Sequence, residues 1–145
     1  MFYIGIDPGK KGAMAVILED GTVEVSPLEG ILLGPILMAL KDKQCRCCLE
    51  KVHAMPKQGV SSTFTFGVQY GWLKGMLDAH YISYQEIPPE RWKKEFGLNT
   101  DKQKSIEVCR QLFPNVSLRP TERSRVDDNN MAEALLMAEY ARREL

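Results

Sequence analysis

The sequence predicts an α/β protein built on a mixed five-stranded sheet, three strands antiparallel and two parallel, flanked by helices. Within the first 26 residues, three apolar or alternating runs are separated by turn signals, a pattern typical of antiparallel strands. Beyond them, short apolar runs alternate with helical segments, which favours strands laid parallel to the first. The 145 residues, 44% of them hydrophobic, are enough for one domain with a single core, which we expect to span residues 1–145.

The opening segment is expected to supply the three antiparallel strands. Apolar runs at residues 2–6 and 12–18 flank a Pro-Gly turn, and residues 22–26 alternate in polarity after a second turn. Asp7 stands where the first run ends. An acid in the middle of a buried strand would need a partner or lose its charge, whereas one at the strand's end can hold its charge at the rim of the sheet. We therefore expect Asp7 to be the centre of an active site.

The next segment is expected to form a helix and then a strand. Residues 30–41 are apolar at helical spacing, and Gly34-Pro35 should delay or kink the start of that helix. Residues 45–49 form a short apolar run after a helix, which predicts a strand parallel to the first. This strand ends at Glu50, the second acid of interest.

A longer helix is expected to follow the loop at residues 51–62, with Ser61 or Ser62 as its cap, and to run to about Ala79. Gly67, Gly71 and Gly75 recur along one face of this helix. Because glycine disfavours helices, something must approach this face closely. Tight packing on the sheet is the favoured interpretation, and a dimer contact is the alternative.

The last part of the chain is expected to add one strand and three helical segments. The expected ranges are a strand at 81–87, a helical turn at 88–94, a helix at 101–112, a polar loop at 115–125 and a last helix at 129–145. Within residues 131–138 of that helix, Glu133 is the only charged residue. Taken alone, it would be explained by a solvated position near the positive end of the helix.

The cysteines do not indicate disulfides or zinc. They are Cys45, Cys47, Cys48 and Cys109. Three fall in one predicted strand, where neighbours cannot readily pair, so we expect reduced core residues. The two histidines, His53 and His80, lack the spacing of zinc ligands. The start lacks the layout of a signal peptide and no apolar run reaches membrane-spanning length, so the expected location is the cytoplasm.

Five acids stand at the ends of elements that the predicted topology brings together. If their strands are parallel neighbours, Asp7 and Glu50 leave the same edge of the sheet and repel each other unless a cation lies between them. Asp127, Asp128 and Glu133 add three carboxylates at the start of the last helix. Such an all-oxygen cluster suits Mg²⁺ or Mn²⁺, and two ions roughly 4 Å apart would activate water against a phosphodiester. Singly, each acid could instead cap a turn or lie at the surface.

Four blocks occur in order along the chain. They are IGIDPG at 4–9, CLEKVHAMPKQGVSSTFTFG at 48–67, PPERWKKEFGL at 88–98 and MAEALLMAEY at 131–140. Together they resemble the RuvC-type Holliday junction resolvases, and most of all their compact phage and organellar branch. The resemblance implies a ribonuclease-H-like fold, a homodimer and magnesium-dependent cleavage of four-way DNA junctions by paired nicks. On this resemblance Asp7, Glu50 and Glu133 match the family's acids of the first strand, the fourth strand and the last helix.

The sequence departs from the family at one position. The family generally places a further acid or a histidine three or four residues before the final acid, where this chain has Asn129 and Asn130. An amide oxygen ligates magnesium more weakly than a carboxylate. Either Asp127 or Asp128 then reaches in from the helix start, or the second metal site is weakened. The expected metal ligands are Asp7, Glu50, Asp128, Asn130 and Glu133.

The net charge of zero conceals a basic stretch. Residues 91–126 contain nine Lys or Arg against four Asp or Glu, which suits contacts with phosphates, although a solvated surface is the alternative. Phe64 and Phe66 lie two apart and cannot both face the core of a helix, so one is a candidate for stacking on an unpaired base, with core packing as the alternative. Lys102 or Lys104 is a candidate for stabilising the phosphate. The expected DNA contacts are Lys10, Lys11, Lys51, Lys57, Phe64, Phe66, Lys102, Lys104, Arg123 and Arg125.

Other functions stay open at this point. One is a related nuclease acting on other branched or flapped DNA. Another is a junction-binding protein whose catalysis is weakened at Asn129 and Asn130. An actin-like nucleotide-binding fold is disfavoured, because it needs two such domains. For a phage protein the expected location would be the host cytoplasm, and for an organellar protein the matrix.

Overall fold

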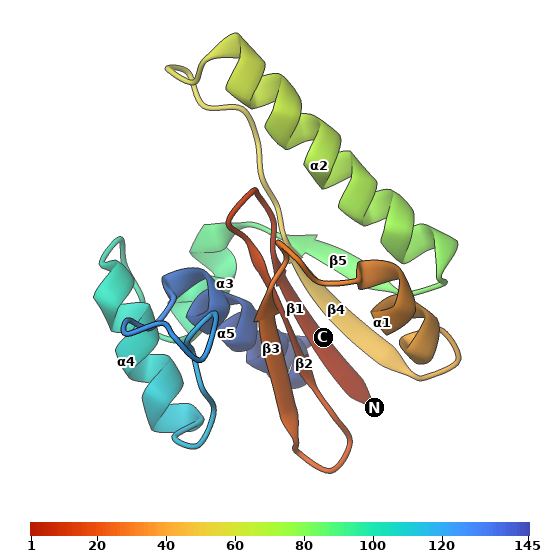
Figure 1. Cartoon of the computed structure of the whole chain (residues 1–145), viewed down its shortest axis with the longest axis vertical. Helices are drawn as coiled ribbons and strands as arrows, with labels where there is room; N and C mark the ends of the chain where they lie inside the picture. Colours follow the sequence, from red (N-terminus) through yellow and green to blue (C-terminus); the bar gives the residue numbers. More distant parts are fainter.

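A computed structural model describes all 145 residues and places a mixed five-stranded sheet at the centre of the protein (Figure 1). Its strands are β1 (Phe2–Asp7), β2 (Ala13–Ile17), β3 (Val23–Pro27), β4 (Cys45–Glu50) and β5 (Tyr84–Ile87). In space their order is β3-β2-β1-β4-β5. The first three strands are antiparallel, β4 is parallel to β1, and β5 is parallel to β4. The predicted fold class is confirmed.

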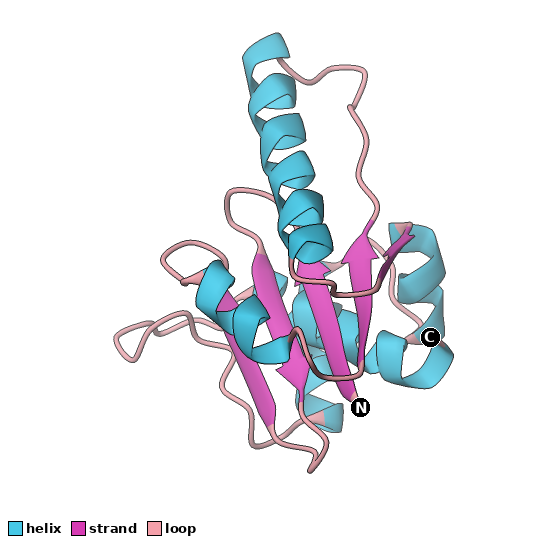
Figure 2. Ribbon diagram, turned by 90° about the vertical axis from the view of Figure 1, so that its right-hand side faces the viewer, coloured by secondary structure: helices cyan, strands magenta, loops and turns pink.

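Helices cover both faces of the sheet. They are α1 (Leu33–Leu40), α2 (Val60–Ala79), α3 (Pro89–Glu95), α4 (Lys102–Leu112) and α5 (Asn129–Glu144). Figures 1 and 2 show α5 lying across one face, with α3 and α4 on the same side, and α1 and α2 on the other. One apolar cluster fills each side of the sheet, so the sheet is buried on both faces. None of the helices combines the length and the apolar character that crossing a bilayer requires.

The packing of α5 on β1 depends on a missing side chain. A Cβ at Gly5 would lie 2.0 Å from the carbonyl oxygen of Ala134 and 2.3 Å from the amide nitrogen of Ala138. Only glycine lets the backbones of strand and helix come this close. This approach fixes the position of α5 along β1, and with it the distance between the start of α5 and the end of β1.

Two local expectations have different outcomes. Helix α1 begins at Leu33, so its proline lies in the first turn, where it displaces no helical hydrogen bond; the predicted delay of its start is confirmed. The predicted serine cap of α2 is wrong, because Gly59 occupies the cap position and no side chain caps the helix. Ser61 and Ser62 already lie within its first turn. All four cysteines are free, with three buried and Cys45 half-buried, as expected.

The glycine stripe of α2, formed by Gly67, Gly71 and Gly75, does not pack on the sheet. A Cβ at any of the three would meet nothing within 4 Å, so the favoured interpretation from the sequence is wrong. Figures 1 and 2 show α2 extending far beyond the sheet, with its first turns farthest from the rest of the protein. Leu73 and Leu77, near its other end, are its buried residues.

Candidate active site

The candidate site lies at the edge where β1 and β4 end side by side. The parallel register pairs Ile6 with Leu49, so Asp7 and Glu50 are the next residues of neighbouring strands. Asp7 is 8% exposed, and Glu50 is half-buried. Two carboxylates that leave one edge of a sheet in this way face the same small volume.

Helix α5 brings its acids to the same edge. Asp128 caps the helix, and its Oδ1 accepts hydrogen bonds from the amides of Asn130 at 2.7 Å and Met131 at 3.3 Å. Glu133 follows in the second turn, with a side chain that is only 13% exposed. It immediately precedes Ala134, whose carbonyl group contacts Gly5, so the close approach of helix and strand also fixes the position of Glu133.

The acids perturb one another electrostatically. Burial, followed by the charges of Glu50 and Glu133, raises the pKa of Asp7 from 3.8 to about 8; Lys93 lowers this pKa, and Asp128 raises it further. Burial is also the main cause that raises the pKa of Glu50, with Glu133 adding to the shift. Carboxylates whose pKa values are raised by burial, and further by one another, form a site that favours a cation.

Glu50 and Glu133 each contact donors that sequence reasoning did not identify. The Trp92 indole Nε1 donates to Glu50 Oε2 at 2.9 Å, and the Ser105 hydroxyl donates to Glu133 Oε1 at 3.3 Å. The Lys93 ammonium lies 3.7 Å from the same Glu133 oxygen. Trp92 and Lys93 belong to the PPERWKKEFGL block, one of the four blocks that carry the family resemblance. The block therefore marked this segment as important, but nothing in it distinguishes Lys93 from Lys94.

The donor set suits a hard divalent cation, because it consists of carboxylate oxygens with neither cysteine nor histidine among them. In this arrangement no group of three acidic, cysteine or histidine side chains converges into a complete metal site. Glu50 and Glu133 instead contact separate donors, and Lys93 is the cation among them. Asp7, Glu50 and Glu133 are the residues that would hold a metal, with Asp128 beside them.

Asp127 has a different surrounding from the other acids. Its carboxylate forms ion pairs with Arg110 and with Arg119, the latter at 3.8 Å between Oδ1 and Nε. The Asn129 side chain donates to the carbonyl group of Lys102 at 3.5 Å. The catalytic role expected for Asp127 therefore stays a prediction, and its present partners are arginines.

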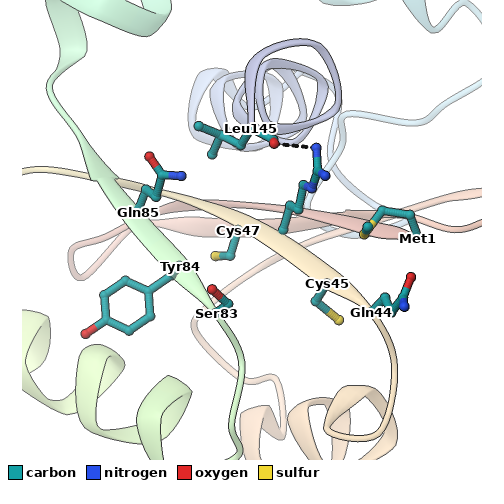
Figure 3. Close-up of a pocket in the computed structure, with 9 residues that line it drawn as sticks. Met1, Gln44, Cys45, Cys47, Ser83, Tyr84, Gln85 and Leu145 are labelled. Atoms are coloured by element: carbon teal, nitrogen blue, oxygen red, sulfur yellow. Dashed lines mark hydrogen bonds between the residues drawn. The ribbon is translucent and has the colours of Figure 1, made fainter.

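A groove of about 560 Å³ adjoins Asp128 at the start of α5. It is lined by Lys11, Ser26, Pro27, Glu29, Gly30, Ile31, Pro120, Thr121, Asp128 and Asn130. Asn130, an expected metal ligand, thus lies at the groove next to the cap of α5. A second cavity, of about 430 Å³, lies at the opposite end of the sheet between the starts of β4 and β5 and the end of α5 (Figure 3). None of its lining side chains is acidic, so it lacks the side-chain donors of the first site.

The residues expected to bind DNA lie on several separate segments of the chain. Lys10 and Lys11 are exposed in the β1–β2 turn, which α2 holds through a 2.7 Å hydrogen bond from Gln69 Nε2 to the Gly9 carbonyl group. The exposed residues elsewhere are Lys51 and Lys57 after β4, Lys102 at the start of α4, and Arg123 and Arg125 before α5. Lys104 is half-buried.

The two phenylalanines of α2 have different surroundings. Phe64 is 73% exposed, whereas Phe66 is half-buried against the turn at Gly9. Of the two, Phe64 has the accessible ring that stacking on a base requires.

Comparisons with known proteins connect this arrangement to one fold. No protein-family model matches the sequence, and a search of curated proteins finds no match either. Among solved structures, the chain is similar to Thermus thermophilus RuvC in complex with a Holliday junction substrate, with a TM-score of 0.62 and 14% identity over 99% of this chain and 97% of that one. A second T. thermophilus RuvC structure has a TM-score of 0.59 and 15% identity, over 99% and 96% of the two chains. The chain therefore has a RuvC-like fold over nearly its whole length.

Proposed function

We propose that this protein is a metal-dependent endonuclease that resolves four-way DNA junctions by paired nicks. The observation that carries the proposal is the buried Asp7 carboxyl, which shares one sheet edge with Glu50 and is opposed electrostatically by Glu133. A folded chain keeps mutually repelling buried acids at some loss of stability, and a divalent cation would reverse that loss. The RuvC-like fold supports branched DNA as the substrate, because one of its structural neighbours is bound to a Holliday junction.

Each residue of the candidate site has its own role in the proposed reaction. Magnesium or manganese, when bound, would activate water and stabilise the leaving oxygen of a phosphodiester. Asp7, Glu50 and Glu133 would hold the ion through carboxylate oxygens. The Lys93 ammonium, already 3.7 Å from Glu133, supplies positive charge next to the place where phosphate must arrive. Lys10, at the turn that follows Asp7, is one of the exposed cations that bind the backbone of the DNA.

A homodimer is the second part of the proposal, and α2 supports it. One face of α2 contacts the body through Leu73 and Leu77. On the opposite side, at helical spacing, lie the glycine stripe and three apolar side chains, Val60, Phe64 and Val68, which are 88%, 73% and 57% exposed. A helix with two apolar faces has the pattern of a helix packed on both sides. The open stripe would let the α2 of a second copy approach closely, while Phe64 lies near the outer end, where DNA can reach it.

The activity is tested with a labelled synthetic four-way junction, a flapped duplex and a linear duplex, each incubated with Mg²⁺, with Mn²⁺ or with EDTA. We expect symmetric paired nicks in the four-way junction alone, dependent on metal and abolished by Asp7→Asn. Asp42→Asn, which changes an exposed acid far from the site in the loop after α1, is the matched control and should cleave like the wild type. Cleavage of the flapped duplex in preference to the junction would favour the related-nuclease alternative.

A second candidate function is junction binding with weakened catalysis. It is favoured by Asn129 and Asn130 at the start of α5 and by the engagement of Asp127 with two arginines. It predicts tight binding of the junction in EDTA with no nicks at any metal concentration. Restoring an acid through Asn129→Asp or Asn130→Asp would then create or increase cleavage.

A further inference from the structure

Trp92 on α3 contacts the candidate site from inside the protein. Its side chain is 0% exposed, and the helix that carries it begins at Pro89, directly after β5. The ring packs in the apolar cluster under α5. Its only polar atom, Nε1, donates a 2.9 Å hydrogen bond to Glu50 Oε2. The indole therefore joins the core of the protein to one specific oxygen of one acid.

This hydrogen bond constrains a side chain that would otherwise move. Glu50 has three rotatable bonds, and the negative charge of Glu133 nearby opposes any arrangement in which its carboxylate faces that acid. A donor aimed at Oε2 holds the carboxylate in one orientation, and a hydrogen bond to an ionised acceptor is stronger than one between neutral groups. With Oε2 engaged, Oε1 remains available to a cation.

We propose that Trp92 is a positioning residue for metal binding, which acts by holding the Glu50 carboxylate through Oε2 so that Oε1 faces a divalent cation. This inference rests on the proposed function. It assigns the indole N–H a role distinct from that of the ring. The ring fills the core, which a phenyl group would also do, whereas only the N–H reaches the acid. Loss of a residue that hydrogen-bonds to a metal ligand typically weakens metal affinity by about 10- to 100-fold.

The test measures binding of Mn²⁺ alone by isothermal titration calorimetry, without DNA, so that it does not depend on activity. Two substitutions remove the N–H. Trp92→Phe also shortens the ring system, whereas benzothienylalanine at position 92 keeps the size of indole and has sulfur in place of N–H. We expect both variants to fold, as followed by circular dichroism in EDTA, and to bind Mn²⁺ at least about tenfold more weakly than the wild type.

A matched control separates positioning from general loss of packing. Leu37→Val removes volume from a fully buried residue of α1, on the opposite face of the sheet, and should leave Mn²⁺ affinity unchanged. In a Glu50→Ala background the effect of Trp92→Phe on Mn²⁺ affinity should fall below about twofold, because the indole would have no carboxylate to hold.

The outcomes distinguish this inference from the proposed function. Wild-type affinity in the benzothienylalanine variant would overturn the positioning role alone, and so would a loss of affinity that persists unchanged in the Glu50→Ala background. Absence of Mn²⁺ binding by the wild-type protein would overturn the metal-dependent function and this inference with it.

Discussion

Replacing Asp7 by asparagine should stabilise the metal-free protein while it abolishes the proposed activity. The carboxyl group is 8% exposed, and burial together with neighbouring acids raises its pKa from 3.8 to about 8. At about 1.4 kcal/mol per pKa unit, this shift sets an upper limit of about 5 to 6 kcal/mol on the free energy lost when the folded protein must ionise Asp7. Relaxation and water near the sheet edge reduce such penalties, so we expect about 2 kcal/mol.

The pH dependence of this effect has a definite sign. The unfolded chain releases the Asp7 proton near pH 4, whereas the folded chain retains it up to about pH 8. The contribution of the protonated carboxyl to stability is therefore complete below about pH 4 and is lost as the pH rises toward 8. Asparagine carries no titrating proton, so Asp7→Asn should match the wild type near pH 4 and exceed it increasingly toward pH 8.5.

The assay is urea unfolding in EDTA at several pH values between 4.5 and 8.5, for the wild type, Asp7→Asn and the exposed control Asp42→Asn. At pH 8.5 the free energy of unfolding of Asp7→Asn should exceed that of the wild type by about 2 kcal/mol, and the control should follow the wild type throughout. Adding Mg²⁺ at 100 times its dissociation constant should stabilise the wild type by about 2.7 kcal/mol and the variant much less. A variant less stable than the wild type at pH 8.5, or a difference that does not grow with pH, would refute this reasoning.

Three further predictions concern packing, association and DNA binding. Gly5→Ala should destabilise the fold by more than about 4 kcal/mol in urea unfolding, because its Cβ would overlap the backbone of α5. Gly34→Ala in α1 is the control: its Cβ would have ordinary contact space, so the substitution should raise the free energy of unfolding by about 0.5 to 1 kcal/mol. Equal effects of the two substitutions would contradict this account. Gly71→Leu should convert a dimer into a folded monomer in analytical ultracentrifugation, and an unchanged mass would exclude the glycine stripe as the interface. The double variant Lys10→Ala and Lys11→Ala should reduce the slope of log affinity for duplex DNA against log salt by up to about 1.8, and an unchanged slope would show that the β1–β2 turn does not contact phosphate.

The sheet was predictable because its signals are local. Apolar runs and turn residues identified all five strands, and the end of each run located Asp7 and Glu50 correctly at the rim. Placing these two acids together required only one inference from topology, that β4 is parallel to β1. The close approach at Gly5 was not predicted, because a glycine inside a strand does not reveal which backbone comes near it.

The remaining features of the site depend on the directions of side chains, which spacing does not encode. Lys93 and Trp92 contact two different acids because α3 has a particular rotation about its axis, and a segment of seven residues is too short to show a periodic face. The glycine stripe was interpreted wrongly for a related reason. Its regular spacing correctly indicated one helical face, but spacing alone does not say whether the sheet or another molecule lies against that face.

The packing of α5 on β1 has two opposite effects on stability. Gly5 allows α5 to lie directly on β1, which buries a large apolar surface and stabilises the fold. That placement also brings Glu133 within electrostatic reach of Asp7. Its charge adds to the effects of burial and of Glu50, which together raise the pKa of Asp7 and destabilise the metal-free protein. The two effects share one cause, because Glu133 is adjacent on the helix to Ala134, whose carbonyl group lies against Gly5. On the proposed function the repulsion is what gives a divalent cation its affinity, so the metal-free protein should be the least stable form at alkaline pH and the metal-bound protein the most stable.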